Sequence, residues 1–182
     1  MSGLVILDRD GVINQDSDAY VKSVDEWIPI PGSAEAIARL SQAGIQVVVA
    51  TNQSGLARGY FTLDGLTAMH RKMEALITAA GGELAGIFFC PHGPEDDCPC
   101  RKPRPGLIHQ IEQTLGRSAQ GAYLVGDSLR DLQAGQQVGC QPILVLTGKG
   151  QCTLARGEGL SGVTVVADLA AAAEHILNQR FT

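Results

Sequence analysis

Short, uninterrupted apolar runs recur along the chain and alternate with segments of helical spacing. The runs occupy residues 4–7, 45–50, 86–89, 122–125 and 142–146. Continuous apolar runs of this length, without polar alternation, are typical of strands that are buried on both faces. A chain that alternates such strands with helices is predicted to form a doubly wound, Rossmann-like α/β fold, a three-layer arrangement with a parallel sheet between helices.

The segments with helical spacing end at glycines, as helices often do. Their expected bounds are 33–43, 63–80, 105–115 and 129–138, followed by Gly44, Gly81, Gly116 and Gly139. Residues 163–166 are expected to add an edge strand and residues 169–178 a closing helix. In this architecture ligands bind beyond the carboxyl ends of the strands, so the polar residues that follow the strands are the candidates for function.

The composition limits the classes of partner. The chain has 182 residues, and we expect one domain over residues 1–182. A net charge of −5 with only 14 scattered Lys and Arg residues argues against a nucleic-acid partner. No apolar stretch has the length of a membrane span, and the chain opens directly on a strand-like run rather than on a signal segment. We therefore expect a cytoplasmic, monomeric protein whose cysteines remain reduced.

A loop rich in cysteine follows the third apolar run. Cys90, His92, Cys98 and Cys100 supply three soft sulfur atoms and one borderline nitrogen atom within eleven residues. This set of donors closes a tetrahedral structural zinc site and leaves no open position for water. Disulfides are the alternative, but Cys-x-His and Cys-x-Cys pairs that flank a loop favour a metal in a reducing compartment. The sequence therefore predicts a structural Zn²⁺ in this loop.

Two carboxylates follow the first apolar run. Asp8 and Asp10 are one residue apart, and the turn that Gly11 permits would let the two side chains take different positions over the cleft. An ordinary Asp-Gly turn is the alternative. An EF-hand calcium loop is excluded by spacing, because Ile13 and Ala19 stand where that loop needs Gly and Glu.

Three further polar clusters follow later runs. Residues 51–55 offer hydroxyl and backbone donors for a phosphoryl oxygen. Arg101 and Lys102 are cations that could bind an anion; the alternative is that the two side chains lie on a solvated surface without a ligand. Asp127 is a hard ligand for Mg²⁺, with Asp131 one helical turn further on; a helix cap is the alternative for Asp127.

Residues 148–150 contain a lysine between two glycines but do not form a P-loop. Ile143 stands where the first glycine of that motif is required, and no Ser or Thr follows the lysine. His70, His109 and His175 lie in helical stretches without partners at ligand spacing, so we expect surface or packing roles for them.

The four clusters, in this order, resemble the motifs of the haloacid dehalogenase (HAD) superfamily of aspartyl phosphotransferases. The matching features are the Asp-x-Asp-Gly segment at 8–11, the hydroxyl of Thr51, Lys102, and the Gly-Asp pair that ends at Asp127. The zinc loop is similar to that of two phosphatase subgroups, which act on a heptose bisphosphate and on histidinol phosphate. Residues 51–59 and 16–20 look like the heptose subgroup.

The resemblance implies a Mg²⁺-dependent phosphatase that removes the C7 phosphate of heptose 1,7-bisphosphate through an aspartyl-phosphate, toward nucleotide-activated heptose for lipopolysaccharide. Asp8 is then the nucleophile, and Asp10 is the general acid and base. Thr51 and Lys102 hold the phosphoryl oxygens. Asp8, the main-chain carbonyl of Asp10, and Asp127 bind Mg²⁺. Arg9 is expected to be structural or peripheral.

The resemblance also implies a set of substrate-binding residues: Asp16, Ala19, Asn52, Gln53, Ser54, Arg58, Arg101 and Ser128. Some heptose phosphatases carry a lysine at the position of Ser128. The zinc loop is expected to hold Arg101 against the distal phosphate, and Asp131 to orient Lys102 or a metal-bound water. Few residues separate Asn14 from the segment 25–27, which leaves no room for a large cap domain.

Two alternatives stay open at this point. A histidinol-phosphate phosphatase would share the fold and the chemistry but would meet a cationic amine, whereas Arg58 and Arg101 favour an anionic substrate. A zinc-stabilised binding module without catalysis is disfavoured, because the chain carries Asp8, Asp10 and Lys102 together.

Overall fold

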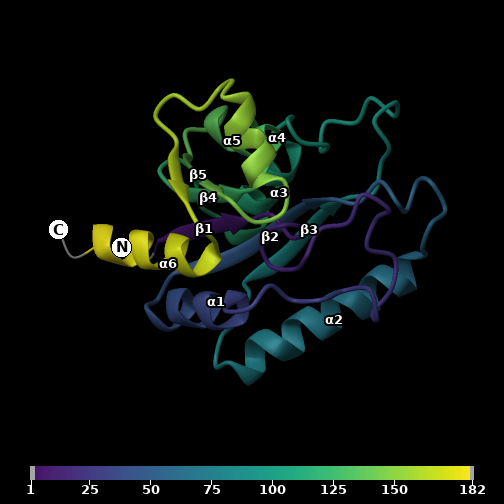
Figure 1. The fold of residues 1–182 in the computed structure, drawn as a ribbon, viewed down its shortest axis with the longest axis horizontal. Helices are drawn as coiled ribbons and strands as arrows, with labels where there is room; N and C mark the ends of the chain where they lie inside the picture. The colour runs from purple at the N-terminus through teal and green to yellow at the C-terminus, as the bar shows by residue number, and fades with distance from the viewer. Residues whose placement is uncertain (1–2, 181–182) are drawn as a thin grey trace.

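The computed structural model describes residues 3–180 and contains a parallel sheet of six strands in the order β3-β2-β1-β4-β5-β6 (Figure 1). The predicted doubly wound sheet is confirmed. The strands are β1 (Leu4–Leu7), β2 (Gln46–Asn52), β3 (Gly86–Cys90), β4 (Tyr123–Gly126), β5 (Gln141–Val145) and β6 (Thr164–Val166).

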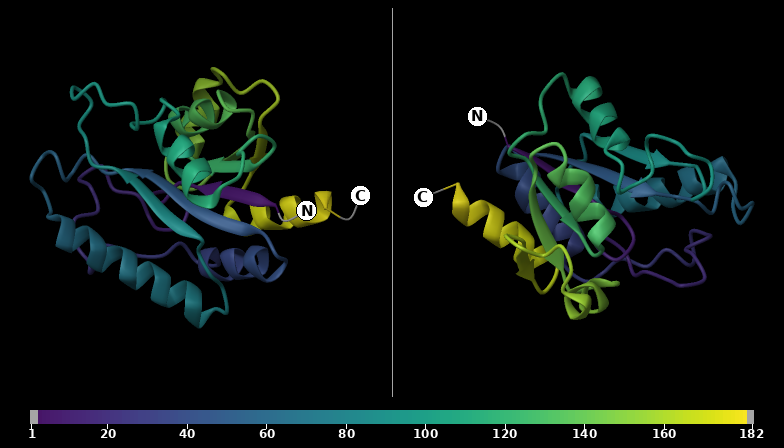
Figure 2. Two further views of the ribbon diagram at one scale, coloured as in Figure 1. Left: turned by 180° about the vertical axis from the view of Figure 1, so that it is seen from behind. Right: turned by 90° about the horizontal axis from the view of Figure 1, so that it is seen from above.

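Helices cover both faces of the sheet. They are α1 (Ser33–Gln42), α2 (Leu63–Ala79), α3 (Gly106–Leu115), α4 (Leu129–Gln136), α5 (Gly150–Arg156) and α6 (Leu169–Gln179). Figures 1 and 2 show α1, α2 and α6 on one face and α3 and α4 on the other. No helix among residues 3–180 is both long enough and apolar enough to cross a membrane.

The alternation of side chains along each strand divides the core in two. Val5 and Leu7 of β1 pack in the cluster that contains the buried faces of α1, α2 and α6. Leu4 and Ile6 pack in a second cluster, with the buried residues of α3 and α4. Burial on both faces explains why the strands read as continuous apolar runs.

Each predicted element is present, with its ends within two residues of the expected bounds. The four glycines that were expected to end helices all have positive φ, between 63° and 86°, which a residue without a Cβ adopts at little cost. Helix α5 was not predicted, because it is short and begins within the glycine-rich segment 148–150.

The strand order reverses beside β1, and this reversal positions the site. β1 pairs with β2 on one side and with β4 on the other, so Leu7 is a neighbour of Val125. The residues that follow these two strands therefore meet at the crevice where doubly wound folds bind ligands. The chain passes from β1 to α1 without a helix or strand between them, so this described segment contains no separate cap domain.

Candidate active site

Three carboxylates converge at this crevice. Asp8 follows β1, Asp127 follows β4 and Asp131 lies in the first turn of α4, and one oxygen atom of each lies within 4.8 Å of the others. Burial and then the charge of Asp131 raise the pKa of Asp8 to about 7. Burial and then the charge of Asp8 raise the pKa of Asp127 to about 8. Hard oxygen ligands with excess negative charge fit a divalent cation such as Mg²⁺.

Lys102 lies against two of these carboxylates. Its Nζ lies 2.9 Å from Oδ1 of Asp8 and 2.6 Å from Oδ1 of Asp131, and it donates to the carbonyl of Ala50 at 2.8 Å. Burial alone would lower the pKa of Lys102, but Asp131 and Asp8 outweigh burial and raise it. The ammonium group is thus fully charged and held in one place. The expected contact between Asp131 and Lys102 is confirmed.

Asn52 fixes the backbone that carries this lysine. Its Oδ1 accepts a hydrogen bond from the main-chain N–H of Lys102 at 3.0 Å, and its Nδ2 donates to the main-chain carbonyl of the same residue at 3.3 Å. The side chain of Asn52 therefore ties the end of β2 to the exit of the cysteine loop. This role was not foreseen from the sequence, in which Asn52 was expected to bind substrate.

The carboxylate of Asp10 faces the same cavity but has other partners. It accepts hydrogen bonds from Arg9, Asn14 and Gln53 at 2.8–3.1 Å. Gln53 also donates to Oγ1 of Thr51 at 3.0 Å. Arg9 is completely buried, so it is structural rather than peripheral.

Two glycines enclose the carboxylate of Asp127. Gly11 and Gly148 have φ of 84° and 56°, and a Cβ on either would overlap Oδ2 of Asp127. The main-chain N–H of Lys149 donates to the same oxygen at 2.9 Å, and Oγ1 of Thr147 donates to the carbonyl of Gly11 at 2.6 Å. Sequence reasoning missed residues 147–149, because this segment was considered only as a P-loop.

The cavity at this edge of the sheet has a volume of about 260 Å³. Most of the predicted site residues line it: Asp8, Asp10, Asp16, Thr51, Asn52, Gln53, Ser54, Arg101, Lys102, Asp127 and Ser128. Ala19 and Arg58 do not line it. The guanidinium of Arg58 instead lies over the ring of Tyr20, 5.8 Å from its centroid, and Tyr20 lines the cavity.

One wall of the cavity is cationic. Arg101 and Arg130 both line it, and Nη1 of Arg101 is buried without a hydrogen-bond partner among the described residues. Burial and then the charge of Arg130 lower the pKa of Arg101. A buried guanidinium nitrogen without a partner, beside a second guanidinium, favours an anionic ligand at this wall. Arg130 was not predicted from the sequence.

Ser128 lines the cavity, but its hydroxyl has a structural partner. It donates to Oδ2 of Asp131 at 2.9 Å, within a capping box that begins α4. The spacing of Ser128 and Asp131 is a sequence signal for such a cap. The alternative reading of Asp127 as the helix cap is wrong, because Ser128 is the N-cap.

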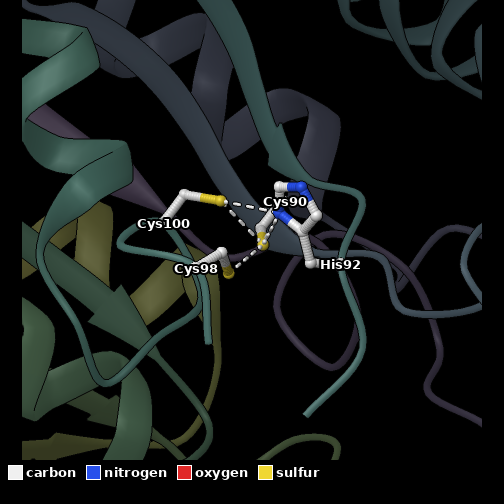
Figure 3. Close-up of side chains that lie close together, drawn as sticks. All are labelled: Cys90, His92, Cys98 and Cys100. Atoms are coloured by element: carbon white, nitrogen blue, oxygen red, sulfur yellow. Dashed lines mark hydrogen bonds between the residues drawn. The ribbon is translucent and has the colours of Figure 1, made fainter. Parts of the chain in front are cut away.

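The cysteine loop brings its four predicted ligands together (Figure 3). Sγ of Cys90 lies 2.9 Å from Sγ of Cys100 and 3.5 Å from Sγ of Cys98, while Nδ1 of His92 lies 3.3 Å from Sγ of Cys100. No two of these cysteines are joined by a disulfide. Three sulfurs and one imidazole nitrogen within 4.8 Å of one another fit a tetrahedral metal site.

The remaining two cysteines lie elsewhere. Cys140 is buried and Cys152 is exposed. Neither belongs to the cluster of Cys90, His92, Cys98 and Cys100. The four predicted ligands therefore form a discrete group, which comes from the end of β3 and the loop that follows it.

Comparisons with known proteins agree with this geometry. Residues 99–172 match the HAD-hydrolase-like family. A D-glycero-β-D-manno-heptose-1,7-bisphosphate 7-phosphatase from Pseudomonas aeruginosa is 57% identical over 96% of this chain and 97% of its own length. One from Neisseria meningitidis serogroup A is 61% identical over 84% of this chain and 82% of its own.

Solved structures give the same result. The D,D-heptose 1,7-bisphosphate phosphatase of B. bronchiseptica, complexed with magnesium and phosphate, has a TM-score of 0.94 and 56% identity, and the match covers 97% of this chain and 99% of that one. The enzyme of Burkholderia thailandensis has a TM-score of 0.77 and 46% identity, with the same coverage. Identity of this level over nearly the whole chain confirms the resemblance, and the protein belongs to the D-glycero-β-D-manno-heptose-1,7-bisphosphate 7-phosphatase family of HAD-like hydrolases.

Proposed function

We propose that this chain removes the 7-phosphate of D-glycero-D-manno-heptose 1,7-bisphosphate to give heptose 1-phosphate, on the way to nucleotide-activated heptose for lipopolysaccharide. The observation that carries the proposal is the contact of Lys102 with Asp8, beside Asp127, at the reversal of strand order. The names of the relatives support the substrate.

The roles of the residues follow from their positions. Asp8 attacks phosphorus and forms an aspartyl-phosphate, while Asp10 gives a proton to the leaving sugar oxygen and later takes one from the attacking water. Lys102 and Thr51 stabilise the negative charge on the phosphoryl oxygens. Hydrolysis of a phosphate monoester requires rate enhancement worth on the order of 20 kcal/mol, so these effects must act together.

Asp8 and Asp127 would hold Mg²⁺, together with the main-chain carbonyl of Asp10. The donor set fits this ion, and the raised pKa values of both carboxyls reflect burial first and then the charge of neighbouring carboxylates. When bound, Mg²⁺ supplies charge neutralisation between the attacking carboxylate and the phosphate. The magnesium and phosphate in the B. bronchiseptica structure support this proposal.

The cationic wall supports a bisphosphate rather than histidinol phosphate. Arg101 and Arg130 would face the phosphate that does not react, and the cationic amine of histidinol phosphate would be repelled there. A zinc ion bound by Cys90, His92, Cys98 and Cys100 would have a structural task, because the loop it orders leads directly into Arg101 and Lys102. The free thiols support a reducing, cytoplasmic setting.

The function is tested by phosphate release, with Mg²⁺, from four substrates at equal concentration. These are the α and β anomers of heptose 1,7-bisphosphate, histidinol phosphate and fructose 1,6-bisphosphate. We expect a heptose anomer to have the highest kcat/KM, and the preferred anomer identifies the pathway that the product enters. A preference for histidinol phosphate would overturn the proposed substrate, and no turnover of any of them would overturn the enzymatic assignment.

A further inference from the structure

The two oxygen atoms of the Asp10 carboxylate have unequal surroundings. Oδ1 accepts from Nε and Nη2 of Arg9 at 3.1 and 2.9 Å, and from Nδ2 of Asn14 at 2.8 Å. Oδ2 accepts from Nε2 of Gln53 at 3.1 Å. An oxygen that accepts three hydrogen bonds, two of them from a guanidinium, is a poor site for a proton. Oδ2 is therefore the oxygen that can exchange a proton with a substrate.

Arg9 is held from its far side by a histidine. It is 0% exposed, and its Nη1 lies 3.2 Å from Nε2 of His70, a buried residue of α2. A guanidinium has only donors, so Nε2 of His70 is the acceptor and the proton of the neutral ring is on Nδ1. Burial and then the charge of Arg9 lower the pKa of His70 to about 4, so the ring is neutral near pH 7.

The other groups around His70 do not replace this contact. The ring of Phe89, near the end of β3, lies 6.2 Å from the His70 ring between centroids and offers no hydrogen bond. The charge of Asp10 also affects the pKa of His70, but the hydrogen bonds of the Asp10 carboxylate are to Arg9 and other residues. His70 thus has one polar partner on its Nε2 side among the described residues, and that partner also binds Asp10. The sequence-based expectation of a surface or packing role for His70 missed this contact.

We infer that His70 is a positioning residue for proton transfer. Its Nε2 fixes the guanidinium of Arg9, which binds Oδ1 of Asp10 through two nitrogens and leaves Oδ2 to act on the substrate. The inference rests on the proposed function, in which the proton on Oδ2 passes to the sugar oxygen as the P–O bond breaks. The electron pair of that bond stays with the sugar oxygen, and the new bond to phosphorus comes from the carboxylate of Asp8.

The test compares leaving groups that differ in their need for a proton. The sugar leaves as an unstable alkoxide unless its oxygen is protonated. From p-nitrophenyl phosphate the leaving group is p-nitrophenolate, which is a stable anion without a proton. His70→Leu removes the acceptor for Arg9, and His70→Gln offers an amide oxygen in its place. Ile77→Ala is the matched control, since Ile77 is also buried on α2 but lies two turns away.

We expect His70→Leu to slow the first phosphoryl transfer from the sugar phosphate by about 10–100-fold, with KM nearly unchanged. The burst of p-nitrophenolate should change by less than about threefold, because that step needs no acid. His70→Gln should restore most of the loss. Ile77→Ala should lower the melting temperature and leave the ratio of the two rates as in the unaltered protein.

Equal slowing of both substrates by His70→Leu, or no slowing of either, in protein that remains folded would overturn the inference. If His70→Leu does not fold, His70→Asn serves instead, because its shorter amide does not reach Arg9, and the same ratio of rates decides. A wrong substrate assignment would give a different result, because the unaltered protein would then hydrolyse another phosphate monoester faster than the heptose bisphosphate. The rates of the His70 variants would in that case be compared on the preferred monoester and on p-nitrophenyl phosphate.

Discussion

Nζ of Lys102 lies 2.9 Å from Oδ1 of Asp8, although 94 positions separate the two residues in the chain. In the sheet β2 lies between β3 and β1, and β4, the next strand in the chain, lies on the other side of β1. The cysteine loop, which follows β3, places Lys102 beside Asn52 at the end of β2. The contact requires the sheet and the loop together. A change in either one should therefore be measurable at Asp8.

The close packing of Gly11 on Asp127 predicts a large effect of one added methyl group. In Gly11→Ala the new Cβ would overlap Oδ2 of Asp127, so we expect activity to fall at least about tenfold and the Mg²⁺ requirement to rise. Gly44→Ala is the matched control, because Gly44 has a similar φ of 78° and nothing within 4 Å of the added atom. Gly44→Ala should lower the free energy of unfolding by only about 1–2 kcal/mol and should leave the activity unchanged. Equal activity in the two variants would contradict the packing argument.

The raised pKa values of Asp8 and Asp127, about 7 and about 8, predict an unusual dependence of stability on pH. Between about pH 4 and pH 8 these two carboxyls keep protons in the folded state that the unfolded state has lost, so they make the free energy of unfolding fall as pH rises. The lowered pKa of His70, about 4, offsets part of this decline below about pH 6.5, so the fall should be clearest above that pH. The slope is at most about 1.4 kcal/mol per pH unit for each carboxyl. Chemical denaturation without Mg²⁺ should show this decline, and Mg²⁺ should reverse it. A flat profile above about pH 6.5 without Mg²⁺ would contradict the prediction, and Asp127→Asn should reduce the slope, because only the raised pKa of Asp8 would remain.

The cysteine cluster predicts that metal, stability and activity are lost together. Cys98→Ser and Cys100→Ser each remove one sulfur donor, so the zinc content should fall below the one ion per chain expected of the unaltered protein. The free energy of unfolding should fall by several kcal/mol. Activity should fall as well, because the loop positions Lys102. Cys152→Ser is the control, since Cys152 is exposed and outside the cluster. Full zinc content and full activity in the Cys98 and Cys100 variants would exclude the structural role.

Arg101 and Arg130 predict selectivity for the distal phosphate. Arg101→Gln and Arg130→Gln should each raise KM for the bisphosphate by about 10–100-fold, in keeping with the loss of one charged hydrogen bond. KM for a sugar monophosphate should change little. Arg156→Gln, in exposed α5 outside the cavity, should change neither value. If Arg101→Gln raised both KM values equally, the arginine would serve the reacting phosphate instead.

The sequence was sufficient for the architecture because continuous apolar runs between helical segments have few alternative folds. The same pattern predicted that Asp8, Thr51 and Asp127 follow strands; Asp8 and Asp127 do, whereas Thr51 is the penultimate residue of β2. The edge of a parallel sheet brings such positions together. Ligand spacing alone was enough to group Cys90 with the other members of its cluster. These are features that short stretches of sequence determine.

Other features depend on contacts between distant segments. His70 and Arg9 are 61 positions apart, and nothing in the local pattern of α2 distinguishes a buried histidine that binds an arginine from one that packs. Arg130 lies next to Arg101 only once α4 is set against the cysteine loop. The expected placement of Ala19 and Arg58 at the cavity wall came from resemblance, and the local loop conformation directs both residues elsewhere.

The most direct test of the central claim is to trap the phosphoryl group on the protein. In Asp10→Asn, p-nitrophenyl phosphate should still transfer its phosphoryl group, whereas attack by water should be slow because its base is missing. Peptide mass spectrometry after an acid quench should then find one phosphoryl group, on Asp8. Asp8→Asn should remain folded, carry no phosphoryl group and lose all turnover. A phosphoryl group on any other residue, or normal turnover by Asp8→Asn, would contradict the mechanism.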